Sequence, residues 1–309
     1  MPEFTNLIPV RPPVLDFKTP KRLPAVARTL TLMAVVLPFL GVVAAAGLLW
    51  GWGFNWMTLA VLAVMTIGPG LGITVGFHRL FTHRSFETNK VVEFLLAVFG
   101  SMAVQGPLLQ WVAIHRRHHQ FSDHDGDPHS PHHHGRGIFG VIRGFWHAHI
   151  GWFFQPDPAN QSRYVKDLRQ SPTLRWASYL FPLWVLAGLV IPTALGFLLM
   201  GGWTGAVLGL VWGGLVRVFI GHHVTWSVNS VCHLWGRQPY PSHDHSKNNF
   251  IVGVIGLGEG WHNNHHAFPT SARHGLKWWQ FDVSWLFIRT LVLFGLARAV
   301  KLPAPQMTN

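Results

Sequence analysis

Histidines in closely spaced groups are the residues of this sequence best suited to chemistry. The 309 residues include 21 His but only 12 Asp and Glu. Four groups recur along the chain: His78 and His83; His115, His118 and His119; Asn229 and His233; and His262, His265 and His266. In the second and the last group the histidines lie at i, i+3 and i+4, which places them on one face of a helix. Such a face can present several imidazoles to one metal ion or to two neighbouring ions.

Two metal ions are the prediction that follows from the number of imidazoles. Nine imidazoles exceed what one ion binds, whereas an isolated histidine usually has only a packing or hydrogen-bonding role. Imidazole suits iron, zinc and copper alike, so the side chains alone do not identify the metal. The His-Glu-x-x-His motif of zinc proteases is absent from the sequence. The single cysteine, Cys232, excludes an intrachain disulfide and an iron–sulfur cluster held by this chain.

Long apolar segments must position these histidines. Only 12% of the residues are charged, about half the usual share of a soluble domain. Four apolar runs approach or exceed the ~20 residues that span a bilayer. They cover residues 29–50, 56–77, 177–200 and 203–221. Buried core helices of a soluble protein would explain these runs poorly, because their short connections carry no charge.

The basic residues predict the orientation of the spans. All 24 Lys and Arg fall in the N-terminal arm, in residues 78–176, or from residue 217 onward. By the positive-inside rule, both termini and the histidine-bearing segments are cytoplasmic. Four tryptophans are expected to mark the opposite interface: Trp50, Trp52, Trp56 and Trp203. The net charge of +12 is scattered and forms no basic stripe, so nucleic acid is not an expected partner.

We therefore expect an all-α, multi-pass integral membrane protein with four transmembrane helices and a cytoplasmic helical cap that carries the histidines. It forms one membrane domain over residues 1–309. Its parts are a cytoplasmic arm at 1–28, hairpins at 29–77 and 177–221, and cytoplasmic segments at 78–176 and 222–309. Two further apolar segments, 91–109 and 283–300, carry polar residues and are expected to lie at the cytoplasmic interface.

The histidine motifs and their flanks resemble those of integral-membrane fatty acid desaturases, in particular the acyl-CoA Δ9 (stearoyl-CoA) type. That type has the motifs HRxxxH, HRxHH and HNxHH, which match residues 78–83, 115–119 and 262–266. The flanking sequences agree as well: GFHRL at 76–80, FSD at 121–123, GDPH at 126–129, TWSVNS at 225–230 and GEGWH at 258–262. The resemblance covers roughly residues 30–300.

The resemblance implies a non-haem di-iron centre, and it assigns roles to individual residues. The iron ligands would be His78, His83, His115, His118, His119, His233, His262, His265 and His266. Asn229 would hold one iron through a water molecule. Gln105 and Trp111, with Trp226 nearby, would line the acyl-binding tunnel and set which carbons face the irons.

Carboxylates near the motifs are expected to orient the imidazoles. The candidates are Asp123, Asp127, Asp244 and Glu259. The chain departs from the animal acyl-CoA enzymes at Ala113-Ile114, where those enzymes carry an Arg-Asp pair that contacts the CoA headgroup. The carrier of the acyl chain therefore stays open between CoA, acyl carrier protein and a membrane lipid. Residues 130–144, with three consecutive histidines, are expected to form a solvated loop outside the metal site.

The expected function is O₂-dependent desaturation. The enzyme would introduce a cis double bond at Δ9 into a saturated long-chain acyl thioester or lipid. A hydroxylase or an acetylenase on the same scaffold is the nearest alternative, and a membrane metal transporter or sensor is an alternative of another class. Electrons must come from a separate donor of the ferredoxin, rubredoxin or cytochrome b5 type with its reductase. An acidic donor would be attracted by the positive cytoplasmic face.

Overall fold

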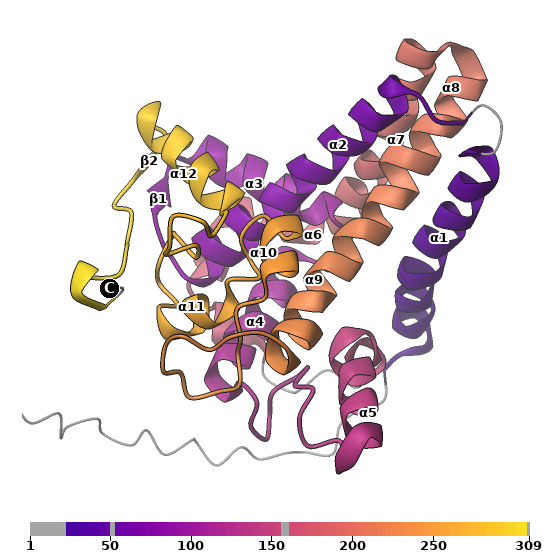
Figure 1. Ribbon diagram of the computed structural model, residues 1–309. Helices are drawn as coiled ribbons and strands as arrows, with labels where there is room; N and C mark the ends of the chain where they lie inside the picture. Colours follow the sequence, from indigo (N-terminus) through magenta and orange to yellow (C-terminus); the bar gives the residue numbers. More distant parts are fainter. Residues whose placement is uncertain (1–22, 50–52, 156–160, 308–309) are drawn as a thin grey trace, which may run out of the picture.

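A computed structural model describes residues 23–49, 53–155 and 161–307 of the chain. Most of the predicted N-terminal arm lies outside these residues, as do Trp50 and Trp52 of the predicted aromatic belt. Figure 1 shows a bundle of long helices and, at one end of it, a layer of shorter helices and loops.

The four predicted membrane spans are confirmed as long apolar helices. They are α1 (Ala25–Leu49), α2 (Trp56–Leu71) with the π-helix η1 (Gly72–Thr82), α7 (Phe181–Met200), and the run of α8 (Gly202–Gly209), η5 (Leu210–Val216) and α9 (Arg217–Leu234). α2 packs against η5 and α7, whereas α1 packs mainly against η5 at the edge of the bundle (Figure 1). The third span is shorter at its start than predicted, because α6 (Pro172–Tyr179) is a separate helix.

Two of the spans continue well past the ends of their apolar runs. The second reaches Thr82 instead of residue 77, and the fourth reaches Leu234 instead of residue 221. Their 27 and 33 residues correspond to about 40 and 50 Å of helix, more than the ~30 Å hydrocarbon core. Backbone hydrogen bonds continue the helix without apolar side chains, so both helices are long enough to extend beyond a bilayer core, and their extended ends carry histidines.

The remaining elements form the cap. They are β1 (Glu87–Thr88), α3 (Lys90–Met102), α4 (Leu108–Phe121), α5 (Gly137–His149), η2 (Gly151–Phe154), η3 (Gln161–Val165), η4 (Leu168–Gln170), α10 (Phe250–Ile255), α11 (His262–Ala267), α12 (Val283–Leu293), β2 (Ala297–Arg298) and η6 (Pro305–Met307). β1 and β2 pair antiparallel. With 13 residues, α3 is about 20 Å long, too short to cross the bilayer core.

The expectation of a solvated loop at residues 130–144 is wrong in part. α5 begins at Gly137 within this segment and packs against α9. His132 hydrogen-bonds the carbonyl oxygen of His233 at 3.2 Å, and His133 hydrogen-bonds that of Asp123 at 3.0 Å. These histidines therefore hold the segment against the cap.

Arg217 departs from the expected distribution of basic residues. It lies inside the fourth membrane helix and is only 2% exposed. Its guanidinium donates hydrogen bonds to the carbonyl oxygens of Met102 (2.5 Å), Gly188 (2.9 Å) and Gly213 (3.1 Å). A buried cation in a membrane needs such partners. Arg217 thus ties α9 to the end of α3 and to α7.

Candidate metal centre and adjoining cavity

The nine histidines singled out in the sequence come together in the structure as two groups. The first group is His78, His83, His115, His119 and His265, and the second is His118, His233, His262 and His266. Within each group, one ligand atom per residue lies within 4.8 Å of all the others. The side chains come from η1 and the residue after it, from α4, from the end of α9 and from α11.

The π-helix η1 explains the spacing of His78 and His83. Residues five apart point in different directions on an α-helix, but i→i+5 hydrogen bonds bring them to the same side of a π-helix. The His83 amide donates to the His78 carbonyl oxygen at 3.2 Å, and the two ring centroids are 4.9 Å apart. Apolar periodicity gives no signal for such a helix, so the sequence did not predict it.

The helices α4 and α11 each contribute to both groups. On α4, His115 and His119 join the first group, with 3.1 Å between their Nε2 atoms, while His118 joins the second. On α11, His265 joins the first group, and His262 and His266 join the second. Adjacent positions on a helix point about 100° apart, so each of these short helices serves two neighbouring centres.

Each of the four predicted carboxylates accepts a hydrogen bond from the Nδ1 atom of one of these histidines. Asp127 pairs with His118 (3.0 Å), Asp123 with His233 (2.8 Å), Asp244 with His266 (2.5 Å), and Glu259 with His78. A proton held on Nδ1 leaves the lone pair on Nε2, the atom available to a metal. Three of the pairs belong to the second histidine group and one to the first.

The residues present fit metal ions in both groups. The Nε2 atoms of His83, His118 and His266 are buried without a hydrogen-bond partner, which is rare for a buried polar atom. The Nε2 atoms of His233 and His262 are 3.0 Å apart, as are those of His78 and His265. An ion that binds imidazole nitrogen at about 2.1 Å, as Zn²⁺ does, holds two such nitrogens about 3.0 to 3.4 Å apart for angles between a right angle and the tetrahedral angle.

For most of these histidines, burial favours the neutral imidazole that metal binding needs. Burial lowers the pKa of five of these histidines well below the usual value: His83, His115, His119, His262 and His265. Burial alone would raise the pKa of Asp123 and Asp244, but their histidine partners outweigh it and lower it. Burial would likewise raise the pKa of Glu259, but Arg79 and His78 outweigh it and lower it. The carboxylates therefore stay ionised and keep the Nδ1 protons in place.

Several buried polar residues next to the centre were not predicted from the sequence. Arg79 is fully buried and donates to Glu259 (2.5 Å) and to Asp282 (3.1 Å). His129 and His274 are buried beside the groups, and neither ring nitrogen of His274 has a hydrogen-bond partner. Arg79 directly follows the first histidine, which is a usable signal, but nothing in the sequence marks Asp282 or His274.

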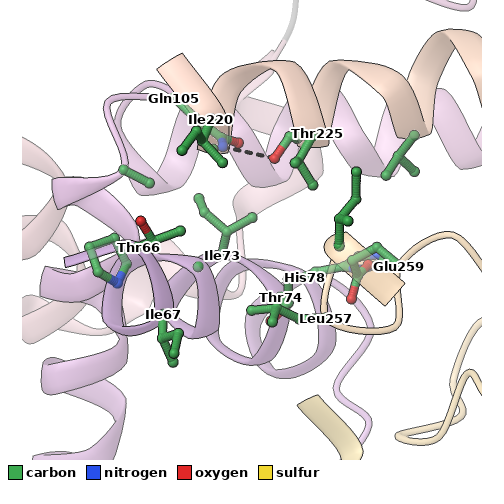
Figure 2. Close-up of a pocket in the computed structure, with 18 of the residues that line it drawn as sticks. Thr66, Ile67, Ile73, Thr74, His78, Gln105, Ile220, Thr225, Leu257 and Glu259 are labelled. Atoms are coloured by element: carbon green, nitrogen blue, oxygen red, sulfur yellow. Dashed lines mark hydrogen bonds and ion pairs between the residues drawn. The ribbon is translucent and has the colours of Figure 1, made fainter. Parts of the chain in front are cut away.

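An elongated cavity leads from the histidine groups into the membrane helices. His78, His115 and His262 line its metal end, with Asn229 beside them, and Met65 and Arg217 line its far end. Two predicted tunnel residues also line it, Gln105 and Trp111. Gln105 donates from Nε2 to the Thr225 hydroxyl oxygen at 2.9 Å (Figure 2).

Trp226, the third predicted tunnel residue, is not among the residues that line the cavity. Its buried ring stacks on His222 at 4.9 Å between centroids and contacts His149 on the side of α9 that faces α5. Thr225, one position earlier on α9, faces the cavity instead. A change of one residue turns a helical side chain by about 100°, and the sequence alone left this rotation unresolved.

Comparison with known proteins gives a consistent set of relatives. The fatty acid desaturase family model matches residues 54–285. A hex-5-enoyl-[acyl-carrier protein] acetylenase of Moorena producens is 43% identical over 274 residues, 88% of this chain and 85% of its own. An sn-1 stearoyl-lipid 9-desaturase of Anabaena variabilis is 43% identical over 81% of this chain and 86% of its own. An icosanoyl-CoA 5-desaturase of Limnanthes douglasii is 40% identical over 82% of this chain and 66% of its own.

Proposed function

Since the chain belongs to the fatty acid desaturase family, we propose that it introduces a cis double bond at Δ9 of a saturated long-chain acyl group, with O₂ as the oxidant. The chain is an oxidoreductase of this family, and its relatives carry out desaturation at several positions. The observation that carries the proposal is the pair of histidine groups at one end of a mainly apolar cavity. The stearoyl-lipid 9-desaturase at 43% identity supports Δ9.

We propose iron as the metal in both groups, held by the nine histidines, with Asn229 binding one ion through a water molecule. Asn229 supports this role because it lines the cavity beside His262 of the second group. When bound, a di-iron centre supplies the oxidising power that removes hydrogen from an unactivated methylene pair. Overall, O₂ takes two hydrogen atoms from the acyl chain, two electrons from the donor and two protons from solvent, and leaves as two molecules of water.

The protein's own part is to orient the ligands, position the acyl chain and exclude water. The four carboxylates fix the imidazole rings through their Nδ1 protons. Trp111 stacks on His115 with 5.0 Å between ring centroids, so a residue of the cavity wall also supports a ligand. The bond between Gln105 and Thr225 satisfies two polar groups in the wall and leaves the surrounding lining apolar.

Electrons would reach the centre from a separate protein of the ferredoxin, rubredoxin or cytochrome b5 type with its reductase. The distribution of basic residues supports a cytoplasmic location for the cap and both termini. The net charge of +12 favours an acidic donor on that side.

Acetylenase activity is the second candidate. The acetylenase of Moorena producens is as identical to this chain, at 43%, as the stearoyl-lipid 9-desaturase is. The alternative of a non-enzymatic metal transporter or sensor is excluded, because the chain belongs to a family of oxidoreductases.

The test is expression in a host that lacks its own desaturase, with fatty acid methyl esters analysed by gas chromatography–mass spectrometry. We expect a new Δ9 monoene from the wild type and none from His265→Ala, since His265 belongs to the first histidine group. An alkyne or a hydroxy acid would assign the alternative chemistry. Absence of any oxidised acyl chain, with iron and a matched donor present, would refute the proposal.

A further inference from the structure

The cavity is open on one side, and three isoleucines form the edge of that opening. Of its lining residues, only Ile67, Ile220 and Ile255 are exposed, by 47%, 37% and 54%. They belong to α2, α9 and α10, three elements distant in the sequence. Figure 2 shows the cavity between the helix that carries Ile220 and the one that carries Ile67. We call this gap between the three isoleucines the lateral opening.

The lateral opening lies at the depth of the bilayer. Trp56 and Trp203, 84% and 82% exposed, stand at the far ends of the second and fourth spans. Along these helices, Ile67 lies about 16 Å and Ile220 about 26 Å from that end, within the ~30 Å hydrocarbon core. The opening therefore extends from the middle of the membrane to the boundary on the histidine side.

The short helix α10 supports this placement. Phe250, Ile251, Val254 and Ile255 are exposed by 60%, 68%, 43% and 54%. An apolar surface of this kind on a six-residue helix is favourable in contact with lipid and unfavourable in contact with water. α10 therefore lies at the membrane boundary, and Ile255 faces acyl chains.

We propose that the lateral opening admits the acyl chain of a membrane glycerolipid directly from the leaflet on the histidine side. The chain enters between α2 and α9, with its methyl end toward Met65 and its ester end toward α10 and the lipid headgroups. This inference rests on the proposed function and names its substrate class. The headgroup stays in the interface, and only the acyl chain leaves the bilayer for the cavity.

The chemistry of the edge favours a lipid over a water-soluble carrier. CoA and acyl carrier protein are anionic and approach from water, where basic side chains would bind them. Every residue at the edge is aliphatic, and the charged residues that line the cavity are already paired: Glu259 with Arg79, and Arg217 with three carbonyl oxygens. An acyl chain moving from bilayer to cavity exchanges one apolar environment for another, so no charged group is desolvated.

The test uses the full chain in phospholipid nanodiscs that contain a phosphatidylglycerol with a photoreactive diazirine in its acyl chain. After illumination, mass spectrometry locates the labelled residues. We expect labelling inside the cavity, at Ile73 or Val224. We expect at least a tenfold loss of that labelling in Ile220→Trp or Ile255→Trp, and labelling that is kept or increased in Ile220→Ala.

Val64→Trp and Val254→Trp are the controls, because both valines are exposed, by 64% and 43%, on two of the helices that form the edge (α2 and α10), but do not line the cavity. They should keep labelling within twofold. Labelling confined to the outer surface, while a diazirine-bearing acyl-CoA labels the cavity, would overturn the inference. The inference would also be overturned if the Ile220→Trp protein kept both its thermal stability and its wild-type labelling. Labelling does not require oxidation, so failure of the proposed desaturation would appear separately as absence of the monoene.

Discussion

At the scale of single residues, the two histidine groups differ in how they are supported. In the second group, three of four imidazoles donate from Nδ1 to a carboxylate: His118, His233 and His266. In the first group only His78 does so, through Glu259. A carboxylate on Nδ1 fixes the ring and increases the basicity of Nε2. The second group should therefore hold its metal more tightly than the first.

Asp127→Asn tests this support at one position. The amide has the same shape but no charge, so His118 loses the anion that keeps its proton on Nδ1. We expect 10- to 100-fold weaker iron binding at the second group, the usual effect of losing such a partner. Iron content per chain, measured during titration with a chelator, checks the prediction. The control is Asp125→Asn, at an exposed position of the same loop. Equal iron loss in both variants would contradict the prediction.

At the scale of elements, close contact between two glycines fixes the π-helix that carries His78. A Cβ atom on Gly72 of η1 would lie 2.1 Å from the backbone nitrogen of Gly100 on α3. η1 is buried along its whole length, and Val75 and Phe77 have no exposed surface. The contact between η1 and α3 therefore positions His78 and His83 relative to α4.

Gly72→Ala should separate these two helices. The added methyl group meets backbone rather than a movable side chain, so we expect a loss of about 1–3 kcal/mol in the free energy of unfolding, together with reduced iron content. Gly47→Ala on α1 is the matched control, because nothing lies within 4 Å of its Cβ position. Thermal unfolding, monitored by size-exclusion chromatography, distinguishes the two variants. The contact would be shown unimportant if both variants unfolded at the wild-type temperature.

The predictability of the elements depended on their surroundings. The four spans followed from apolar length alone, because the bilayer sets a fixed thickness. Their ends were missed, as at Thr82 and Leu234, because a helix can continue into water without a change in its backbone. α5 was missed because its apolar face is short and interrupted by glycine.

At the scale of the whole molecule, the two histidine groups join segments that are distant in the sequence. The nine histidines come from the ends of two membrane spans and from two cap helices, α4 and α11. Without metal, two groups of imidazoles and several unpaired Nε2 atoms stay buried together. Metal binding therefore stabilises the cap much more than it stabilises the membrane helices.

Removal of iron should loosen the cap and leave the spans intact. At a free metal concentration of 100 times Kd, binding contributes about 2.7 kcal/mol per site, or about 5.4 kcal/mol for two sites, so we expect chelation to lower the melting temperature by about 10 °C. Hydrogen exchange should rise in α4 and α11 and stay unchanged in α1. Added Fe²⁺ should restore the protection and Mg²⁺ should not, because imidazole is a poor ligand for Mg²⁺. Uniform exchange changes across all helices would contradict this account.

The sequence by itself determined the four spans and the residue types of the site, because bilayer thickness and imidazole chemistry are local constraints. It also singled out nine histidines and four carboxylates that the fold brings together. Only the tertiary structure decided which histidine belongs to which group, that Thr225 rather than Trp226 faces the cavity, and that Arg217 is buried. These outcomes depend on helix rotation and on contacts between distant segments, which no local pattern encodes.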